Sequence, residues 1–140
     1  MKFAYIETST WINAVENDPA FNVVVINHLQ SLKRDGWILC ISEMVLLELY
    51  CKPIKEENYD LLHLYHQIIE NTNHIPCYKE MLTESLRIIY TDRLHVSDAI
   101  HVAMAKQGSC DLFVTTDKHF KNLTVINPYV IELPKLEILK

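Results

Sequence analysis

The sequence is short of glycine, of closely spaced cysteines and of long apolar runs. Its two glycines, Gly36 and Gly108, each fall where a helical pattern stops and an apolar run follows, which predicts helix-to-strand turns. No apolar run is long enough to cross a bilayer, and the first one meets an acid at Glu7. We therefore expect a soluble cytoplasmic protein that has no signal peptide and does not enter the membrane.

The cysteines have no C-x-x-C pair among them. Their wide spacing speaks against a disulfide framework or a zinc knuckle. Each lies among apolar or helical residues, so we expect buried free thiols, which suits a reducing compartment. These cysteines are Cys40, Cys51, Cys77 and Cys110.

An excess of basic charge is also missing. Thirteen Lys and Arg residues are outnumbered by 18 Asp and Glu, which gives a formal net charge of -5. A protein that grips nucleic acid with its whole surface needs positive charge against the phosphates, so any nucleic-acid site here must be a local basic patch. The 140 residues, 49% of them hydrophobic, are enough for one core, and we predict a single domain over residues 1–140.

Short apolar runs alternate with helical apolar spacing along the chain. The pattern predicts helices after a cap at Ser42, before Pro53, and after a cap at Ser97. Because the strands are apolar throughout, we predict a three-layer α/β/α domain with a mostly parallel central sheet covered on both faces. The expected strands are 3–6, 37–41, 74–76, 112–114 and 125–126, and the expected helices begin near 11 and span 19–34, 43–51, 56–70, 78–90 and 98–107.

Four acids come after strands or open a helix at what would be one end of this sheet. In open α/β sheets the binding crevice lies outside the carboxyl ends of the strands. Glu7 and Asp117 come after strands, Glu48 lies about two helical turns beyond the 37–41 strand, and Asp98 would open a helix. We therefore predict that these four carboxylates form a catalytic site.

Clustered carboxylates need a compensating charge. Two of them about 4 Å apart repel by about 4 kcal/mol at an effective dielectric constant of about 20, so a cation or a raised pKa is required. Oxygen ligands alone favour Mg²⁺ or Mn²⁺, and our candidate ligands are Glu7, Asp98 and Asp117. Such an ion lowers the pKa of a bound water and stabilises charge on a phosphate, which favours phosphodiester hydrolysis.

Four segments resemble, in order, the four motifs of the PIN-domain family. They are YIETS from Tyr5, EMVLLEL from Glu43, SDAIHVA from Ser97 and VTTDKHF from Val114. The resemblance runs from the first strand to about residue 126, and the length is similar to that of VapC-type toxins. It implies a PIN fold, a magnesium- or manganese-dependent endoribonuclease with RNA as substrate, a homodimer and, for VapC-like members, a cognate antitoxin that blocks the site.

The family usually has an aspartate where this chain has Glu7. The extra methylene displaces the carboxylate by up to about 1.5 Å, and misplacement on this scale can cost about a hundredfold in rate. The backbone compensates, or the metal binds differently, or cleavage is lost while RNA or protein binding is kept. Our prediction is the toxin ribonuclease of a toxin–antitoxin pair, and the alternative is a catalytically impaired PIN-like binding module.

Other polar residues have both functional and ordinary structural interpretations. Thr8 and Thr115 either support the carboxylates through hydrogen bonds or are plain cap and strand residues. Lys52 and Lys118, each close to one of the acids in sequence, are the best candidates for RNA contacts. Other basic residues either add to an RNA-facing rim or are ordinary solvated surface; they are Lys33, Arg34, Lys55, Arg87 and Arg93.

The four acids have plain interpretations too. Asp98 would stabilise the start of its helix, Asp117 would cap a turn, and Glu48 would be a solvated helix position. His63 and His66 share a helical face, but no further ligands follow at zinc spacing.

A phospho-acceptor receiver domain is a third possibility, because receivers also gather acids, a Thr and a Lys at the carboxyl ends of a parallel sheet. It has little support, because no Asp directly follows the 37–41 strand.

Overall fold

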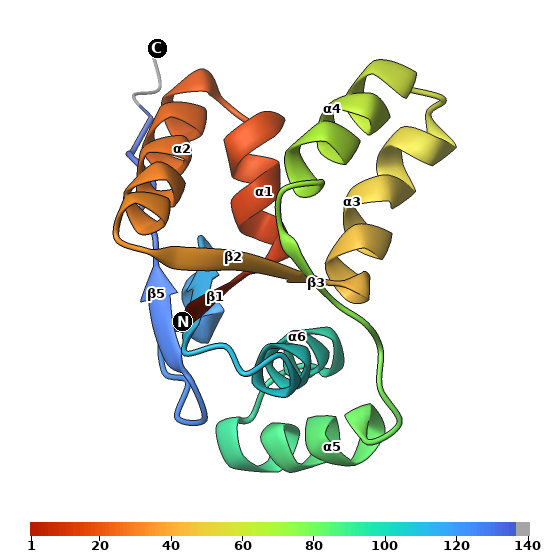
Figure 1. Ribbon diagram of the computed structural model, residues 1–140, viewed down its shortest axis with the longest axis vertical. Coiled ribbons are helices and arrows are strands. Elements are labelled where there is room, and N and C mark those ends of the chain that lie inside the picture. The colour runs from red at the N-terminus through yellow and green to blue at the C-terminus, as the bar shows by residue number, and fades with distance from the viewer. Residues whose placement is uncertain (137–140) are drawn as a thin grey trace.

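The computed structural model describes residues 1–136, so the last four residues of the predicted 1–140 domain lie outside the described part (Figure 1). Five strands form the sheet: β1 (Lys2–Ile6), β2 (Trp37–Ser42), β3 (Asn73–Ile75), β4 (Leu112–Thr115) and β5 (Asn127–Val130). Their order is β3-β2-β1-β4-β5, and every adjacent pair is parallel. The predicted mostly parallel sheet is confirmed.

Helices cover both faces of the sheet. They are α1 (Thr8–Val15), α2 (Pro19–Arg34), α3 (Glu43–Lys55), α4 (Tyr59–Ile69), α5 (Met81–Asp92) and α6 (Val96–Gln107), with a short 3₁₀ helix, η1 (Lys118–Phe120). Figure 1 shows α1 to α4 on one side of the sheet and α5 with α6 on the other. This is the predicted three-layer α/β/α arrangement. None of the helices within residues 1–136 has the length and apolar character needed to span a membrane.

The central strands are apolar on both faces because helices cover both. In β1, Ala4, Tyr5 and Ile6 are fully buried, and Phe113 and Val114 of β4 are equally buried. Runs of this kind are typical of parallel strands between two helical layers. Burial of the larger apolar side chains among them, at about 1.5–3 kcal/mol each, stabilises the pairing of β1 with β4.

Strand register places the residues that follow β1 and β4 beside one another. Ile6 pairs with Val114, and the backbone N–H of Glu7 donates to the Val114 carbonyl at 2.9 Å, one step beyond the strand. On the other side Tyr5 pairs with Cys40 of β2. The carboxyl ends of β1, β2 and β4 thus share one edge.

Two turn predictions are confirmed. Ser42 caps α3, its Oγ accepting from the Val45 N–H at 3.3 Å, and Gly36 turns into β2 with a φ of 90°. Gly108 lies before β4, where a Cβ would come within 2.3 Å of the Ile75 side chain. Its role is therefore close packing of the turn against β3.

Several predicted boundaries were wrong. Helix α3 continues through Pro53 to Lys55, because Pro53 is buried and its packing outweighs the loss of one backbone hydrogen bond. Helix α6 begins at Val96, and the N-cap position is His95, so Ser97 lies inside the first turn and is not the cap. The edge strand is β5 (Asn127–Val130), not 125–126, and its proline at position 128 suits an edge.

The remaining differences concern starts of helices and two thiols. Helix α1 already begins at Thr8 because Glu7 caps it, and α4 begins only at Tyr59, after a cap by Asn58. All four cysteines are free, as predicted, but Cys51 and Cys77 are exposed while Cys40 and Cys110 are buried.

Candidate active site

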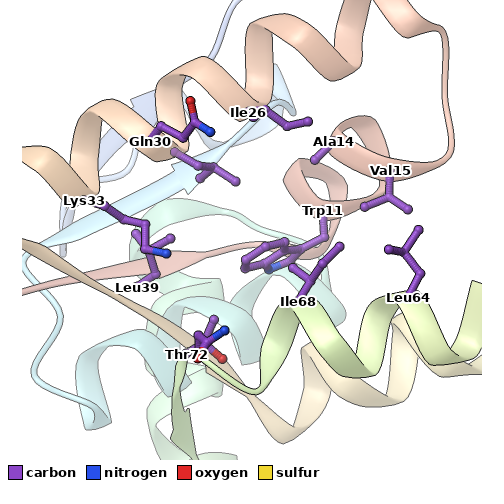
Figure 2. A pocket seen from close by; sticks show the side chains of 12 residues that line it. Trp11, Ala14, Val15, Ile26, Gln30, Lys33, Leu39, Leu64, Ile68 and Thr72 are labelled. Atoms are coloured by element: carbon purple, nitrogen blue, oxygen red, sulfur yellow. The ribbon is translucent and has the colours of Figure 1, made fainter.

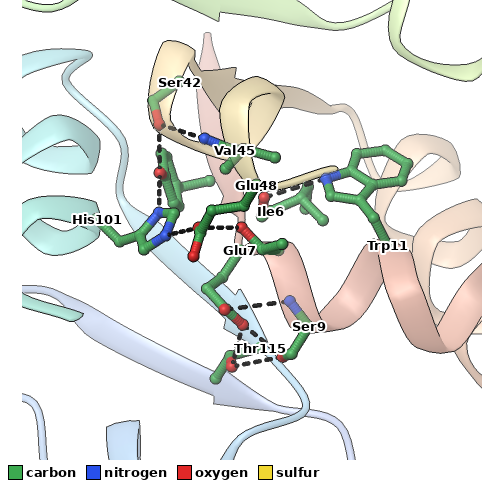
Figure 3. A network of polar contacts seen from close by, with 11 residues as sticks. Ile6, Glu7, Ser9, Trp11, Ser42, Val45, Glu48, His101 and Thr115 are labelled. Atoms are coloured by element: carbon green, nitrogen blue, oxygen red, sulfur yellow. Dashed lines mark hydrogen bonds and ion pairs between the residues drawn. The ribbon is translucent and has the colours of Figure 1, made fainter. Parts of the chain in front are cut away.

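Glu7 is held at the junction of β1 and α1. It is the N-cap of α1, and its Oε1 accepts from the Ser9 N–H at 3.1 Å. Its Oε2 accepts from the hydroxyls of Ser9 at 2.5 Å and Thr115 at 2.8 Å (Figure 3). Burial, with 7% of the residue exposed, raises the pKa of Glu7, while these three hydrogen bonds act in the opposite direction.

Ser9 is a site residue that sequence reasoning missed. Its Oγ also accepts from the Thr116 hydroxyl at 2.8 Å, and Thr116 in turn accepts from the Asn13 amide at 2.8 Å. The hydroxyl cluster therefore ties α1 to the end of β4. In the sequence, the run of hydroxyl residues after β1 is matched by a second run after β4, and that is the signal that could have found it.

Glu48 is held by a different set of donors. Its Oε1 accepts from the Thr8 hydroxyl at 2.7 Å and is hydrogen bonded to Nε2 of the buried His101. Burial acts to raise the pKa of the Glu48 carboxyl, but the hydrogen bonds from His101 and Thr8 lower it below its ordinary value. His101 was not predicted. A histidine three residues after Asp98 on an otherwise apolar helix face is the signal it leaves.

Asp98 and Asp117 form the third part of the site. Asp98 lies in the first turn of α6, where partial burial and the charge of Asp117 raise its pKa. Asp117 caps η1 by accepting from the His119 N–H at 2.9 Å, and it pairs with His119 Nδ1 at 3.0 Å. Asp98 takes part in no ion pair within residues 1–136. The charge of Asp117 therefore acts on an Asp98 carboxylate that has no ion-pair partner in this range.

Thr115 links two of the predicted acids. Its hydroxyl donates to Glu7 and accepts from the Asp117 N–H at 3.0 Å. The two predicted threonines thus both contact carboxylates, Thr8 on Glu48 and Thr115 on Glu7. Within residues 1–136 no three His, Cys, Asp or Glu side chains are already gathered into a metal-binding group.

The two lysines have different surroundings. Lys118 lies in the first position of η1, directly after Asp117, with an exposed side chain. Lys52 forms an ion pair with Glu16 at 3.0 Å, and the Tyr65 hydroxyl donates to the same carboxylate. Lys52 is therefore engaged with α1 in this structure, whereas Lys118 adjoins the acids.

Replacing Asp98 by Asn should raise the free energy of unfolding of the metal-free protein at pH 7. The folded state holds the pKa of Asp98 above its ordinary value of 3.8, so ionisation of this carboxyl destabilises the folded state as the pH rises above that value. The gain should vanish below about pH 3, where the carboxyl is protonated in both states.

Urea unfolding in the presence of EDTA at the two pH values measures this difference. Asp60→Asn is the matched control, because Asp60 is an exposed first-turn acid of α4, and we expect no gain from it. An Asp98→Asn protein no more stable than the parent at pH 7 would contradict the prediction.

Comparison with known proteins agrees with the fold. VapBC2 from Rickettsia felis bound to a DNA fragment from its promoter is similar at 17% identity and a TM-score of 0.72, over 93% of this chain and 99% of that one. The toxin–antitoxin complex from Klebsiella pneumoniae has 17% identity and a TM-score of 0.67, over 88% and 94%. FitAcB from Neisseria gonorrhoeae has 19% identity and a TM-score of 0.70, over 90% and 96%. No curated protein matches the sequence.

At these identities the structural likeness is one of fold, and the sequence match is more specific. The PIN domain family model matches residues 4–126. That range includes Glu7, Glu48, Asp98 and Asp117, and the match supersedes the receiver alternative. The chain belongs to the PIN-domain family.

Proposed function

We propose that this chain is a divalent-metal-dependent endoribonuclease, the toxin of a toxin–antitoxin pair, working as one domain over residues 1–140. The observation that carries the proposal is that Glu7 and Asp117 follow the carboxyl ends of β1 and β4, and that Asp98 in the first turn of α6 lies within range of the Asp117 charge, in a PIN-domain chain. Likeness in fold to the toxin–antitoxin complex from Klebsiella pneumoniae supports the toxin assignment.

The acids fit a hard divalent cation. Asp98 and Asp117 offer oxygen donors. Burial and the charge of Asp117 both raise the pKa of Asp98, and a cation bound there would offset both costs. Mg²⁺ or Mn²⁺ would be held by these two carboxylates with Glu7, and when bound it would supply positive charge against the substrate phosphate and activate water. Phosphodiester hydrolysis needs no side-chain nucleophile in this arrangement.

The other side chains orient the reactants. Glu48 keeps the pKa of its carboxyl low and is therefore ionised at neutral pH. Thr8 and His101 both bond its Oε1, and Oε2 accepts no hydrogen bond from residues 1–136, so Oε2 can accept a proton from the attacking water. We assign phosphate contacts to Lys118 and, when it releases Glu16, to Lys52.

Cleavage of RNA should require Mg²⁺ or Mn²⁺ and should fall by at least about a hundredfold in Asp98→Asn, because one reacting group is then lost from the site. A fluorophore-quencher RNA pool of mixed sequence, with and without EDTA, measures the rate. Asp60→Asn should cleave like the parent. Metal-independent cleavage, or full activity in Asp98→Asn, would overturn the assignment.

A second candidate function is a PIN-like module that binds RNA or protein without cleaving. The observation that favours it is Glu7, whose two oxygens already accept three hydrogen bonds, from Ser9 and Thr115. A carboxylate with its oxygens occupied in this way offers less to a cation.

Glu7→Asp separates the two candidates. The shorter Asp side chain still suits the N-cap of α1 but is withdrawn from Thr115, so an oxygen becomes available to the metal. If the parent is impaired, Glu7→Asp should gain at least about tenfold in cleavage rate and bind Mn²⁺ more tightly by titration calorimetry. If the parent is an efficient nuclease, the same substitution should leave the rate unchanged or lower it. Glu80→Asp, at an exposed acid before α5 whose side chain makes no cap hydrogen bond, is the control.

An antitoxin is the partner that we propose for the apolar groove shown in Figure 2. The groove has a volume of about 410 Å³ and lies between α1, α2 and α4, with lining side chains that include Trp11, Ile26, Leu39, Leu64 and Ile68. The Trp11 indole N–H donates to the Ile6 carbonyl at 3.1 Å, one residue before Glu7. An apolar antitoxin segment seated here would therefore lie close to the site, and Lys33 at the groove offers a contact for an acidic side chain.

Charges placed on the groove should abolish antitoxin control without abolishing toxicity. We expect Ile26→Glu with Leu64→Glu to arrest growth of an expressing cell as the parent does, but to lose relief by the co-expressed cognate antitoxin, because carboxylates would be buried against apolar side chains. Gln107→Glu, which adds a carboxylate at an exposed position on α6 outside the groove, should keep relief. Relief that survives in the groove variant would contradict this site.

We also propose that the active form is a homodimer. Large exposed apolar side chains lie on α3 and α5, away from the groove, and they give a second copy an apolar surface. They are Leu47, Ile54, Leu82, Leu86 and Tyr90.

A further inference from the structure

A buried hydrogen-bond chain runs from the start of α3 to Glu48 (Figure 3). The Tyr5 hydroxyl lies 2.7 Å from Ser42 Oγ and 2.7 Å from His101 Nδ1. His101 Nε2 is hydrogen bonded to Glu48 Oε1. The four side chains come from β1, β2, α3 and α6, so elements from both helical layers and the sheet meet in this chain.

The histidine in this chain has little freedom to move. His101 is 2% exposed, and Tyr5 and Ser42 are fully buried. Tyr5 meets the imidazole edge-on with ring centroids 5.9 Å apart, and its other neighbour Phe113 stacks on it at 5.2 Å. Both ring nitrogens of His101 thus have partners in a tightly packed core, and the ring orientation is fixed from two sides.

The hydrogen bonds in this series all donate in one direction, from Ser42 toward Glu48. The Val45 N–H donates to Ser42 Oγ, so the Ser42 hydroxyl hydrogen is left for Tyr5 Oη. The Tyr5 O–H then donates to His101 Nδ1, which leaves the Nε2–H to donate to Glu48. This assignment gives every donor in the chain a partner with a neutral imidazole, as buried polar groups require.

Glu48 receives two donors on the same oxygen. Thr8 from the start of α1 donates to Oε1 at 2.7 Å, and His101 bonds the same atom from α6. Two donors on opposite elements restrict rotation of the carboxylate, and they leave Oε2 without a hydrogen bond from residues 1–136. An apolar side chain of similar size would fill the position of His101 but could not hold Glu48.

We propose that His101 is a positioning residue for the cleavage reaction, fixed by Tyr5 and Ser42, and that it orients Glu48 so that Oε2 serves the attacking water. The inference rests on the proposed ribonuclease function. It extends that function to residues that contact neither the substrate nor the metal. Removing a side chain that orients a functional group from behind commonly lowers activity by about 10–100-fold.

Four variants test the role with a mixed-sequence fluorophore-quencher RNA pool and Mn²⁺. His101→Leu should lower kcat by about 10–100-fold with little change in KM or in Mn²⁺ affinity by titration calorimetry. His101→Gln retains an N–H donor and should recover part of kcat. In Glu48→Gln, adding His101→Leu should cause no further loss, because the interaction is already broken.

A merely structural histidine gives a different pattern. Losses would then be additive in the double variant, and His101→Gln would be no better than His101→Leu; either result overturns the proposal. Tyr5→Phe is the variant least exposed to a folding defect, because it keeps the ring stacked on Phe113 and removes only the hydroxyl. It should fold and lower kcat by about 3–10-fold, and unchanged kcat would overturn the role of Tyr5 in fixing His101.

A measurement that does not depend on RNA cleavage separates the positioning role of His101 from the proposed function. Nitrogen-15 NMR of histidine-labelled protein should show His101 as the Nε2–H tautomer, with an Nε2–H signal that shifts in Glu48→Gln. The Nδ1–H tautomer would overturn the proposal. If the parent cleaves no RNA with either metal, the proposed function fails and the positioning role fails with it, even where the tautomer is as expected. If the parent cleaves and His101→Leu cleaves equally well, only the positioning role fails.

Discussion

Strand β1 pairs in parallel with β2 on one side and with β4 on the other, and this double pairing decides which side chains can meet. Because all three strands run the same way, the residues that follow them emerge at one edge. Glu7, Ser42 and Thr115 are therefore neighbours although they lie far apart in the chain. A slip of one residue would turn Tyr5 to the other face and break its contact with His101.

The acids at this edge differ in what offsets the free-energy cost of burying a charged carboxylate. Glu7 accepts hydrogen bonds from Ser9 and Thr115, which stabilise its charge without a cation. Glu48 is bonded by His101 and Thr8. Among residues 1–136 Asp98 has neither kind of support, and burial together with the charge of Asp117 raises its pKa. Asp98 is thus the acid of the site beside which a cation would gain most.

Local pattern was enough to predict the sheet and the positions of the acids, but not their partners. Apolar runs identify buried strands, and an acid directly after such a run must lie near the sheet edge. Ser9 and His101 were missed because their contacts with Thr115 and Tyr5 span about a hundred residues, which no local spacing encodes. Apolar periodicity assigns a face to a residue and does not say which hydroxyl or imidazole will meet it there.

The errors in element boundaries have a similar origin. Pro53 was expected to end α3, yet it lies inside the helix as a buried residue, and its packing outweighs the one backbone hydrogen bond that it cannot donate. The residues around 125–126 are apolar enough for a strand, but register with β4 selects Asn127–Val130. In both cases packing against the rest of the domain outweighed the local preference.

This chain has Glu7 where the family usually has aspartate. Hydrogen-bond donors and a metal ion therefore compete for the two carboxylate oxygens of Glu7. The longer side chain turns back over the N-terminus of α1, where it caps the helix and accepts from Ser9. A divalent cation must share those oxygens with the Ser9 and Thr115 hydroxyls, or displace them. Stability and metal affinity therefore act on the same carboxylate in opposite directions, and the difference between an efficient and an impaired nuclease reduces to which set of partners holds Glu7 more strongly.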